Sequence, residues 1–151
     1  MEGNSFRDFK EQFGSLDPPE VLEGVWQGEP VGPGWYLALA GPSLSIGGLG
    51  GWWGKDFDGQ GGIDNILERD GSFRRTLRGE VRRADSLVDG KPCQRIEYPM
   101  GSRLPWTWVV DELRQVGEGE LLGMMVLNIG WLPHLAFPFA LHAQQEVETL
   151  G

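Results

Sequence analysis

Residues suited to acid–base chemistry gather in one segment of this sequence. Asp111, Glu112 and Arg114 lie close together, and Tyr98 precedes them by a short stretch of chain. A carboxylate buried among tryptophans can serve as a general acid or base. A buried Glu112–Arg114 pair can instead hold structure or orient a carboxylate ligand. These four residues are our candidate catalytic residues, with an ion pair at the wet end of a strand as the alternative interpretation.

Tryptophan, phenylalanine and a few polar side chains are candidates for the wall of a ligand cavity. On strand alternation, Trp53, Lys55 and Phe57 share one face, and Lys55 there either pairs with an anionic group or extends to solvent. Trp26 is as consistent with a core residue as with a residue that contacts a ligand. The candidate ligand-binding residues are Trp26, Trp35, Trp53, Lys55, Trp106, Trp108, Met124, His134 and Phe137.

The elements that position these residues are mostly short strands. The sequence has 24 glycines and 10 prolines, which divide it into many short pieces. Only residues 5–16 predict a helix, with Ser5 and Asp8 as a capping box and a stripe of Phe6, Phe9 and Phe13. The segments that predict strands are 22–27, 36–39, 52–57, 65–68, 73–84, 94–98, 106–115, 121–127 and 137–145.

Alternation along the segment 106–115 orients the candidate catalytic residues. Trp106 and Trp108 share one face of the predicted strand, and Glu112 and Arg114 continue that face. Asp111 falls on the opposite face. We therefore expect Glu112 and Arg114 on the tryptophan side of the sheet.

Composition limits the classes of partner. The net charge of −9 and the pI of about 4.6 disfavour nucleic acid, whose phosphates need a basic surface. The single cysteine, Cys93, excludes an internal disulfide and a cysteine-rich metal site. No nucleophile elbow, phosphate-binding glycine loop or HExxH motif occurs, so we expect no metal and no cofactor.

The uncharged stretch 121–143 is long enough to span a bilayer. Glycines and prolines interrupt it, and no Lys or Arg follows Arg114, so two strands joined by a turn explain it better than a membrane helix. The N-terminus lacks the pattern of a signal peptide. We therefore expect no membrane association and a cytoplasmic location, where a free cysteine is stable.

Three motifs resemble the GXWXG family of small bacterial and fungal proteins. They are Gly24-Val25-Trp26-Gln27-Gly28, Gly51-Trp52-Trp53-Gly54-Lys55-Asp56-Phe57, and the segment from Val110 to Met124. The resemblance implies a lipocalin-like barrel, related in shape to fatty-acid-binding proteins and nitrobindins, and carries no settled activity. Nitrobindins bind haem through a histidine in a similar Pro-His-Leu setting, which would make His134 a haem ligand. A solvated turn histidine is the alternative.

Together these patterns predict one mainly β domain over residues 1–151. Residues 1–19 would form a short N-terminal helix and linker, and residues 20–151 a closed, lipocalin-like antiparallel β-barrel with the helix plugging one mouth. We expect the barrel to bind a hydrophobic small molecule, as a monomer or homodimer. The alternatives are a cofactor-independent isomerase, cyclase or hydratase acting on such a molecule, and haem binding through His134.

Overall fold

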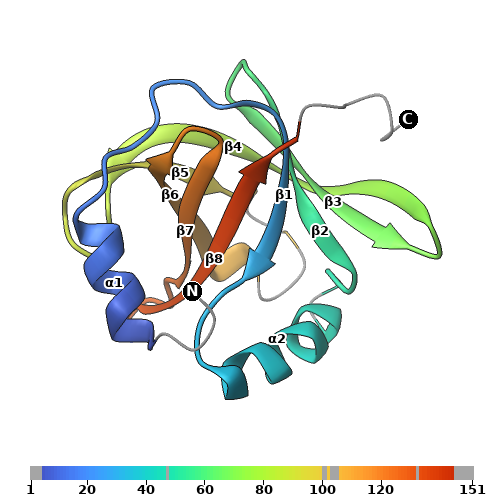
Figure 1. Ribbon diagram of the computed structural model, residues 1–151, viewed down its shortest axis with the longest axis horizontal. Coiled ribbons are helices and arrows are strands. Elements are labelled where there is room, and N and C mark those ends of the chain that lie inside the picture. Colours follow the sequence, from blue (N-terminus) through green and yellow to red (C-terminus); the bar gives the residue numbers. More distant parts are fainter. Residues whose placement is uncertain (1–4, 47, 100–101, 103–105, 132, 145–151) are drawn as a thin grey trace.

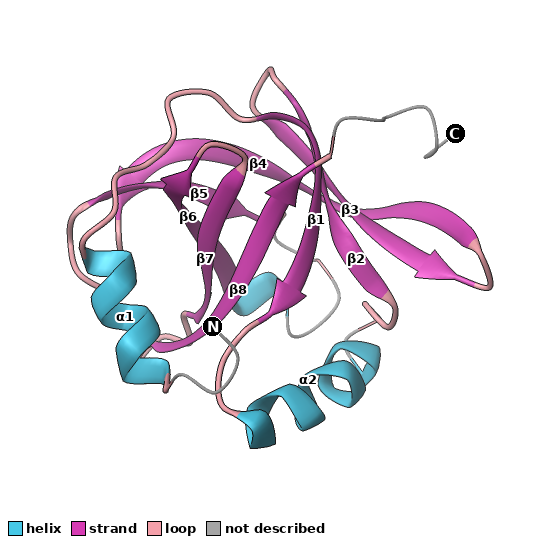
Figure 2. Cartoon of the chain, in the orientation of Figure 1, coloured by secondary structure: helices cyan, strands magenta, loops and turns pink. Residues whose placement is uncertain are grey.

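The computed structural model shows a closed barrel of eight antiparallel strands with a helix on its outside and a second helix beside one of its ends (Figures 1 and 2). It describes residues 5–46, 48–99, 102, 106–131 and 133–144. The strands are β1 (Glu23–Pro30), β2 (Trp52–Asp58), β3 (Gly62–Arg69), β4 (Ser72–Asp85), β5 (Pro92–Glu97), β6 (Val109–Gly117), β7 (Glu120–Leu127) and β8 (Leu135–Ala143).

Each strand pairs with its neighbour in the sequence, and β8 closes the barrel by pairing with β1. Closure removes the exposed strand edges that an open sheet would present. The predicted mainly β, closed antiparallel barrel is therefore confirmed. Of the predicted strands, 36–39 is wrong, and Gln145 lies outside the described residues.

The N-terminal helix α1 (Phe6–Gly14) forms as predicted, but it does not plug the barrel. Ser5 caps it with the predicted capping box, in which Ser5 and Asp8 bond each other's backbone N–H. Phe9 and Phe13 pack on Leu122 and Met124, whose side chains project from the outer face of β7. The helix therefore covers the outside of the barrel wall, because the apolar side chains on that face need burial.

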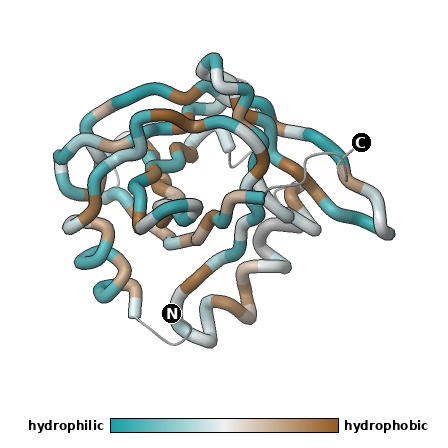
Figure 3. The backbone as a smooth tube through the Cα atoms, turned by 45° about the horizontal axis from the view of Figure 1, so that its top comes forward, coloured by the Kyte–Doolittle hydropathy of each residue, from teal (hydrophilic) through white to brown (hydrophobic). Residues whose placement is uncertain are grey.

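The second helix, α2 (Gly34–Ile46), was not expected from the sequence. It contains no charged residue and has no distinct polar face, so the pattern around Tyr36 and Leu39 predicts a strand where the chain forms a helix. The tube along α2 lacks the strong teal of charged residues (Figure 3). It lies beside the end of the barrel where β1 finishes and β2 begins (Figure 1). No helix among the described residues has the length and hydrophobicity to cross a membrane.

The barrel interior is filled at one end and open at the other. Apolar side chains that include Phe57, Ile63, Leu113, Leu121 and Leu141 pack together in the closed half. Toward α2, the inward residues on the same strands leave a cavity. The change from packed to hollow occurs where polar residues replace apolar ones on β2, β3 and β6.

Candidate functional site

The cavity has a volume of about 400 Å³ and a largely apolar wall. This volume is within the range that holds one small organic molecule. Its lining residues come from α2, the strands, the short 3₁₀ helix η1 (Trp106–Trp108) and two connecting segments, which contribute Leu49 and Tyr98. They are Pro30, Trp35, Tyr36, Leu39, Ala40, Leu49, Trp52, Lys55, Asn65, Tyr98, Trp106, Val109, Asp111, Met125, Leu127, Phe137 and Phe139.

A cluster of four polar side chains forms the floor of this cavity, and Lys55 lies at its centre. The Nζ atom of Lys55 donates hydrogen bonds to Asn65 Oδ1 at 2.8 Å, to Asp111 Oδ2 at 2.9 Å and to the Tyr98 hydroxyl at 3.0 Å. These three bonds match the three protons of an ammonium group. Lys55 is 3% exposed and Asp111 is 4% exposed, so the ion pair is buried.

Tyr98 and Asn65 hold this ion pair in place. The Tyr98 hydroxyl donates to Asp111 Oδ2 at 2.7 Å, and burial together with the Asp111 charge raises the pKa of Tyr98 well above its usual value. The Asn65 amide donates to the Leu77 carbonyl at 3.0 Å, which orients Oδ1 toward Lys55 and toward the Trp52 indole N–H. The phenol therefore stays protonated, as a donor rather than a base.

A β-bulge in β2 brings Lys55 and Trp52 to the same side of the sheet. The register with β3 shifts between Trp52 and Gly54, so Trp53 is an extra residue on β2. Trp52 and Lys55 both line the cavity, whereas Trp53 packs on the outside against Phe73. The predicted inward position of Trp53 is wrong because simple alternation does not pass through a bulge.

The same kind of error affects β6. Residues 106–108 form η1, so the strand and its alternation begin only at Val109. Trp106 lines the cavity, while Trp108 is 42% exposed and is not part of the lining. Asp111 therefore points inward, and Glu112 and Arg114 lie on the outer face, the reverse of our expectation.

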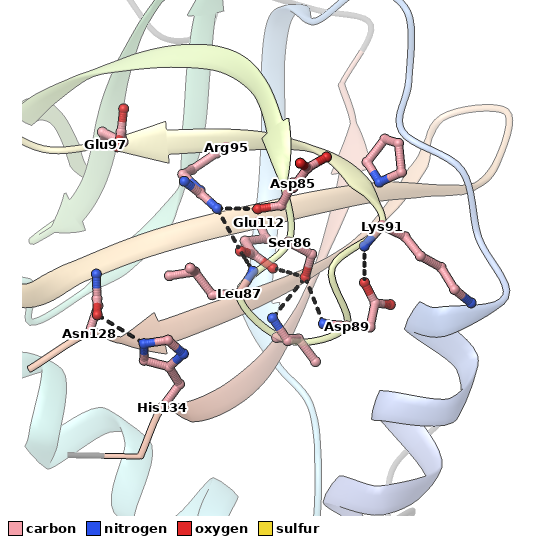
Figure 4. A network of polar contacts seen from close by, with 12 residues as sticks. Asp85, Ser86, Leu87, Asp89, Lys91, Arg95, Glu97, Glu112, Asn128 and His134 are labelled. Atoms are coloured by element: carbon pink, nitrogen blue, oxygen red, sulfur yellow. Dashed lines mark hydrogen bonds and ion pairs between the residues drawn. The ribbon is translucent and has the colours of Figure 1, made fainter. Parts of the chain in front are cut away.

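Glu112 and Arg114 are nevertheless fully buried, beneath α1 and the turn that follows β4. Glu112 accepts hydrogen bonds from the Ser86 hydroxyl at 2.5 Å and from the Leu87 backbone N–H at 2.7 Å, as Figure 4 shows. Arg114 donates to both carboxylate oxygens of Asp89, at 2.5 and 2.7 Å. This network attaches the turn to the barrel wall, outside the cavity.

Arg114 also fastens α1 to the barrel. Its Nη1 atom donates to the Phe13 carbonyl at 2.9 Å, and its guanidinium group lies 4.2 Å from the centre of the Phe13 ring. The bidentate bond with Arg114 lowers the pKa of Asp89 to about 2. Among the candidate catalytic residues, the cavity thus brings together Tyr98 and Asp111, and it leaves Glu112 and Arg114 in a structural network.

The remaining candidate ligand-binding residues divide between the cavity and other places. Trp35 and Phe137 line the cavity. Trp26 packs beside the apolar cluster in the closed half, and Met124 lies under α1. His134 is exposed, with its Nε2 atom 3.0 Å from Asn128 Oδ1 (Figure 4). Sequence reasoning missed Asn65 and Trp52, and only the inward alternation of β3 and the bulge place them here.

Comparison with known proteins establishes the fold alone. A crystal structure of a protein from Thermomonospora curvata matches this chain with a TM-score of 0.67 and 20% sequence identity. The match covers 95% of this chain and 91% of that one. No protein-family model matches the sequence, and no curated protein matches it.

Proposed function

We propose that this protein binds a hydrophobic small molecule inside its barrel. The observation that carries the proposal is the cavity of about 400 Å³, walled by aromatic and aliphatic side chains and floored by one polar cluster. An apolar wall favours ligands that leave water, and a few polar groups at one end orient them. The expected ligand is therefore an apolar molecule with one polar group that reaches Lys55, Asp111 or Tyr98.

The uncharged helix α2 supports this proposal, because it provides the part of the wall nearest the opening. Trp35, Tyr36, Leu39 and Ala40 all border the cavity, although Trp35 is 63% and Leu39 57% exposed. Burial raises the pKa of Tyr36 to about 12, so its hydroxyl stays neutral. A ligand that enters past α2 meets apolar surface and no charge until it reaches the floor.

Displacement of a fluorescent apolar probe tests the proposal, together with native mass spectrometry for a co-purified ligand. Met125 lines the cavity, and Met125→Trp fills part of it. We expect this variant to weaken probe binding by about tenfold or more, since the lost contacts are worth roughly 1.4 kcal/mol or more. The matched control is Val21→Trp, at a position that is 69% exposed. Equal binding by the two variants would place the probe outside the cavity and contradict the proposal.

A second candidate is cofactor-free catalysis on the same class of molecule, as an isomerase, cyclase or hydratase. The buried carboxylate of Asp111 at the cavity floor favours it, because such a group can take a proton from a bound molecule. Asp111→Asn would then reduce turnover far more than it weakens binding. The haem alternative lacks comparable support, since His134 is exposed and bonds with Asn128 rather than facing the cavity.

Membership of the GXWXG family remains a hypothesis that rests on the motifs. Gly24 has a positive φ of 82°, and a side chain at Gly28 would collide with the Trp52 ring. Both glycines around Trp26 therefore have a physical reason to be glycine in this barrel.

A further inference from the structure

Lys55 is placed as a nucleophile would be in a site for carbonyl compounds. Its amino group lies at the floor of an apolar cavity, between a carboxylate and a phenol, at 2.9 Å from Asp111 Oδ2 and 3.0 Å from the Tyr98 hydroxyl. The rings of Trp52, Tyr98 and Phe139 surround it, with centroids 5.5 to 5.8 Å from Nζ. The exposed parts of these groups face the space that a ligand would fill.

The pairing with Asp111 supplies a route to the neutral amine. Transfer of one proton from Lys55 to Asp111 turns an ion pair into two neutral groups, so it creates no net charge in the cavity. The acceptor for the lysine proton thus lies within hydrogen-bond distance of the amine that must lose it before it can attack a carbonyl carbon.

We propose that Lys55 forms a Schiff base with an apolar aldehyde or ketone held in the cavity. This inference rests on the proposed binding function and names the polar group of the ligand, a carbonyl. Carboxylates and alcohols of similar size would bind in the cavity without this reaction. The lysine would then be a catalytic residue, and Asp111 and Tyr98 would handle its protons.

The reaction balances with the groups at the floor alone. Asp111 takes one proton from the Lys55 ammonium, and the amine nitrogen attacks the carbonyl carbon while the carbonyl electron pair moves to oxygen. That oxygen receives the proton from Asp111, which gives a carbinolamine that is still protonated on nitrogen and restores the Asp111 carboxylate. The Tyr98 hydroxyl, hydrogen-bonded to Asp111, lies where it can pass a further proton to the departing oxygen and recover one from the nitrogen by way of Asp111. The carbon–oxygen bond breaks, and water leaves.

The product retains the charge of the starting site. One positive charge remains on nitrogen, now as a protonated imine, and the Asp111 carboxylate remains its counterion. The phenol of Tyr98 ends protonated, as its raised pKa favours. The apolar walls of the cavity limit the access of water, which would otherwise hydrolyse the imine.

Reductive trapping on the full-length protein tests the inference. The probe is decanal, an apolar aldehyde, with cyanoborohydride present to convert an imine into a stable secondary amine, and peptide mass spectrometry locates the alkyl group. The lysines of the chain are Lys10, Lys55 and Lys91, and the exposed Lys10 and Lys91 serve as internal references. We expect Lys55 to be labelled about tenfold faster than either reference, despite its burial.

Variants separate a catalytic lysine from a merely accessible one. Lys55→Arg should remove the fast labelling, and Tyr98→Phe and Asp111→Asn should slow it while labelling of Lys10 and Lys91 is unchanged. Circular dichroism identifies any variant that fails to fold, and in that case the wild-type comparison among the three lysines still decides.

The failures of the two proposals are distinguishable. If decanal displaces the apolar probe but labels Lys55 no faster than Lys10, the Schiff base is overturned and the binding function stands. If decanal and its alcohol analogue decanol both fail to displace the probe, and Met125→Trp leaves probe binding unchanged, the binding function and the Schiff base are both overturned.

Discussion

Asp111→Asn tests whether the Lys55–Asp111 pair is shielded from solvent. Asparagine keeps the shape of the side chain and its ability to accept a hydrogen bond, but it removes the negative charge. Lys55 would then hold an uncompensated charge at a site that is 3% exposed. Removing one partner of a buried ion pair typically costs about 3–5 kcal/mol. For a domain of this size, each kcal/mol lowers Tm by roughly 2–4 °C, so we expect a loss of about 6–20 °C.

Urea denaturation of the wild type, the Asp111→Asn variant and the Lys55→Met/Asp111→Asn double variant measures this cost. The double variant should recover most of the lost free energy of unfolding, because it removes the isolated charge as well. A matched surface control is Asp56→Asn, which removes an acid from the partly exposed pair with Arg75 and should cost no more than about 1 kcal/mol. A loss below about 1 kcal/mol for Asp111→Asn would refute the reasoning, since it would mean that water in the cavity already solvates Lys55 as well as the surface does.

Three further predictions concern other parts of the barrel. Because Arg114 lowers the pKa of Asp89 to about 2, the pair stabilises the fold at pH values above the ordinary aspartate pKa near 4, and this stabilisation should be lost as pH falls from 4 to 2, with solvent screening at this exposed aspartate limiting the loss to about 1 kcal/mol. Urea melts of wild type and Asp89→Asn should therefore converge at the acid end, and parallel curves would contradict this. Gly123→Ala places a methyl group against the Phe139 ring and should destabilise the fold by about 1–3 kcal/mol while weakening probe binding; unchanged binding would mean that the ring does not shift into the cavity. Burial raises the pKa of Cys93 to about 12, so a thiol reagent at pH 8 should modify it only after unfolding, and rapid labelling of the native protein would show that the segment opens.

The parts of the fold that follow from local pattern were predictable. Turn residues separate most of the strands, and the Ser5–Asp8 capping box with its phenylalanine stripe identifies α1. The position of α1 was not predictable in the same way. An apolar stripe indicates that one face of a helix is buried, but it does not identify the surface on which that face packs. The helix α2 was missed because its residues are apolar on all sides, and a period of 3.6 is then absent.

The candidate site shows a second limit of sequence reasoning. Lys55, Tyr98 and Asp111 were identified by residue type. The structure brings them together from β2, from the residue that follows β5, and from β6, respectively. Alternation placed Trp53 on the wrong face of β2, because the bulge adds one residue there, and it inverted the faces of β6, because residues 106–108 form a turn of 3₁₀ helix before the strand begins. By residue type, Glu112 is as suitable for acid–base chemistry as Asp111. Only the position at which β6 begins shows that Asp111 lines the cavity and that Glu112 belongs to the buried network outside it.

The bulge at Trp53 decouples the two surfaces of the barrel wall. The supernumerary residue belongs to the outer side alone, since β3 meets Trp52 and Gly54 on either side of it with a shifted register. Deletion of Trp53 would leave Trp52, Gly54 and Lys55 in regular strand alternation, and Trp52 and Lys55 would still point inward. The outer face of this strand can therefore gain or lose a residue while Trp52 and Lys55 keep their inward positions.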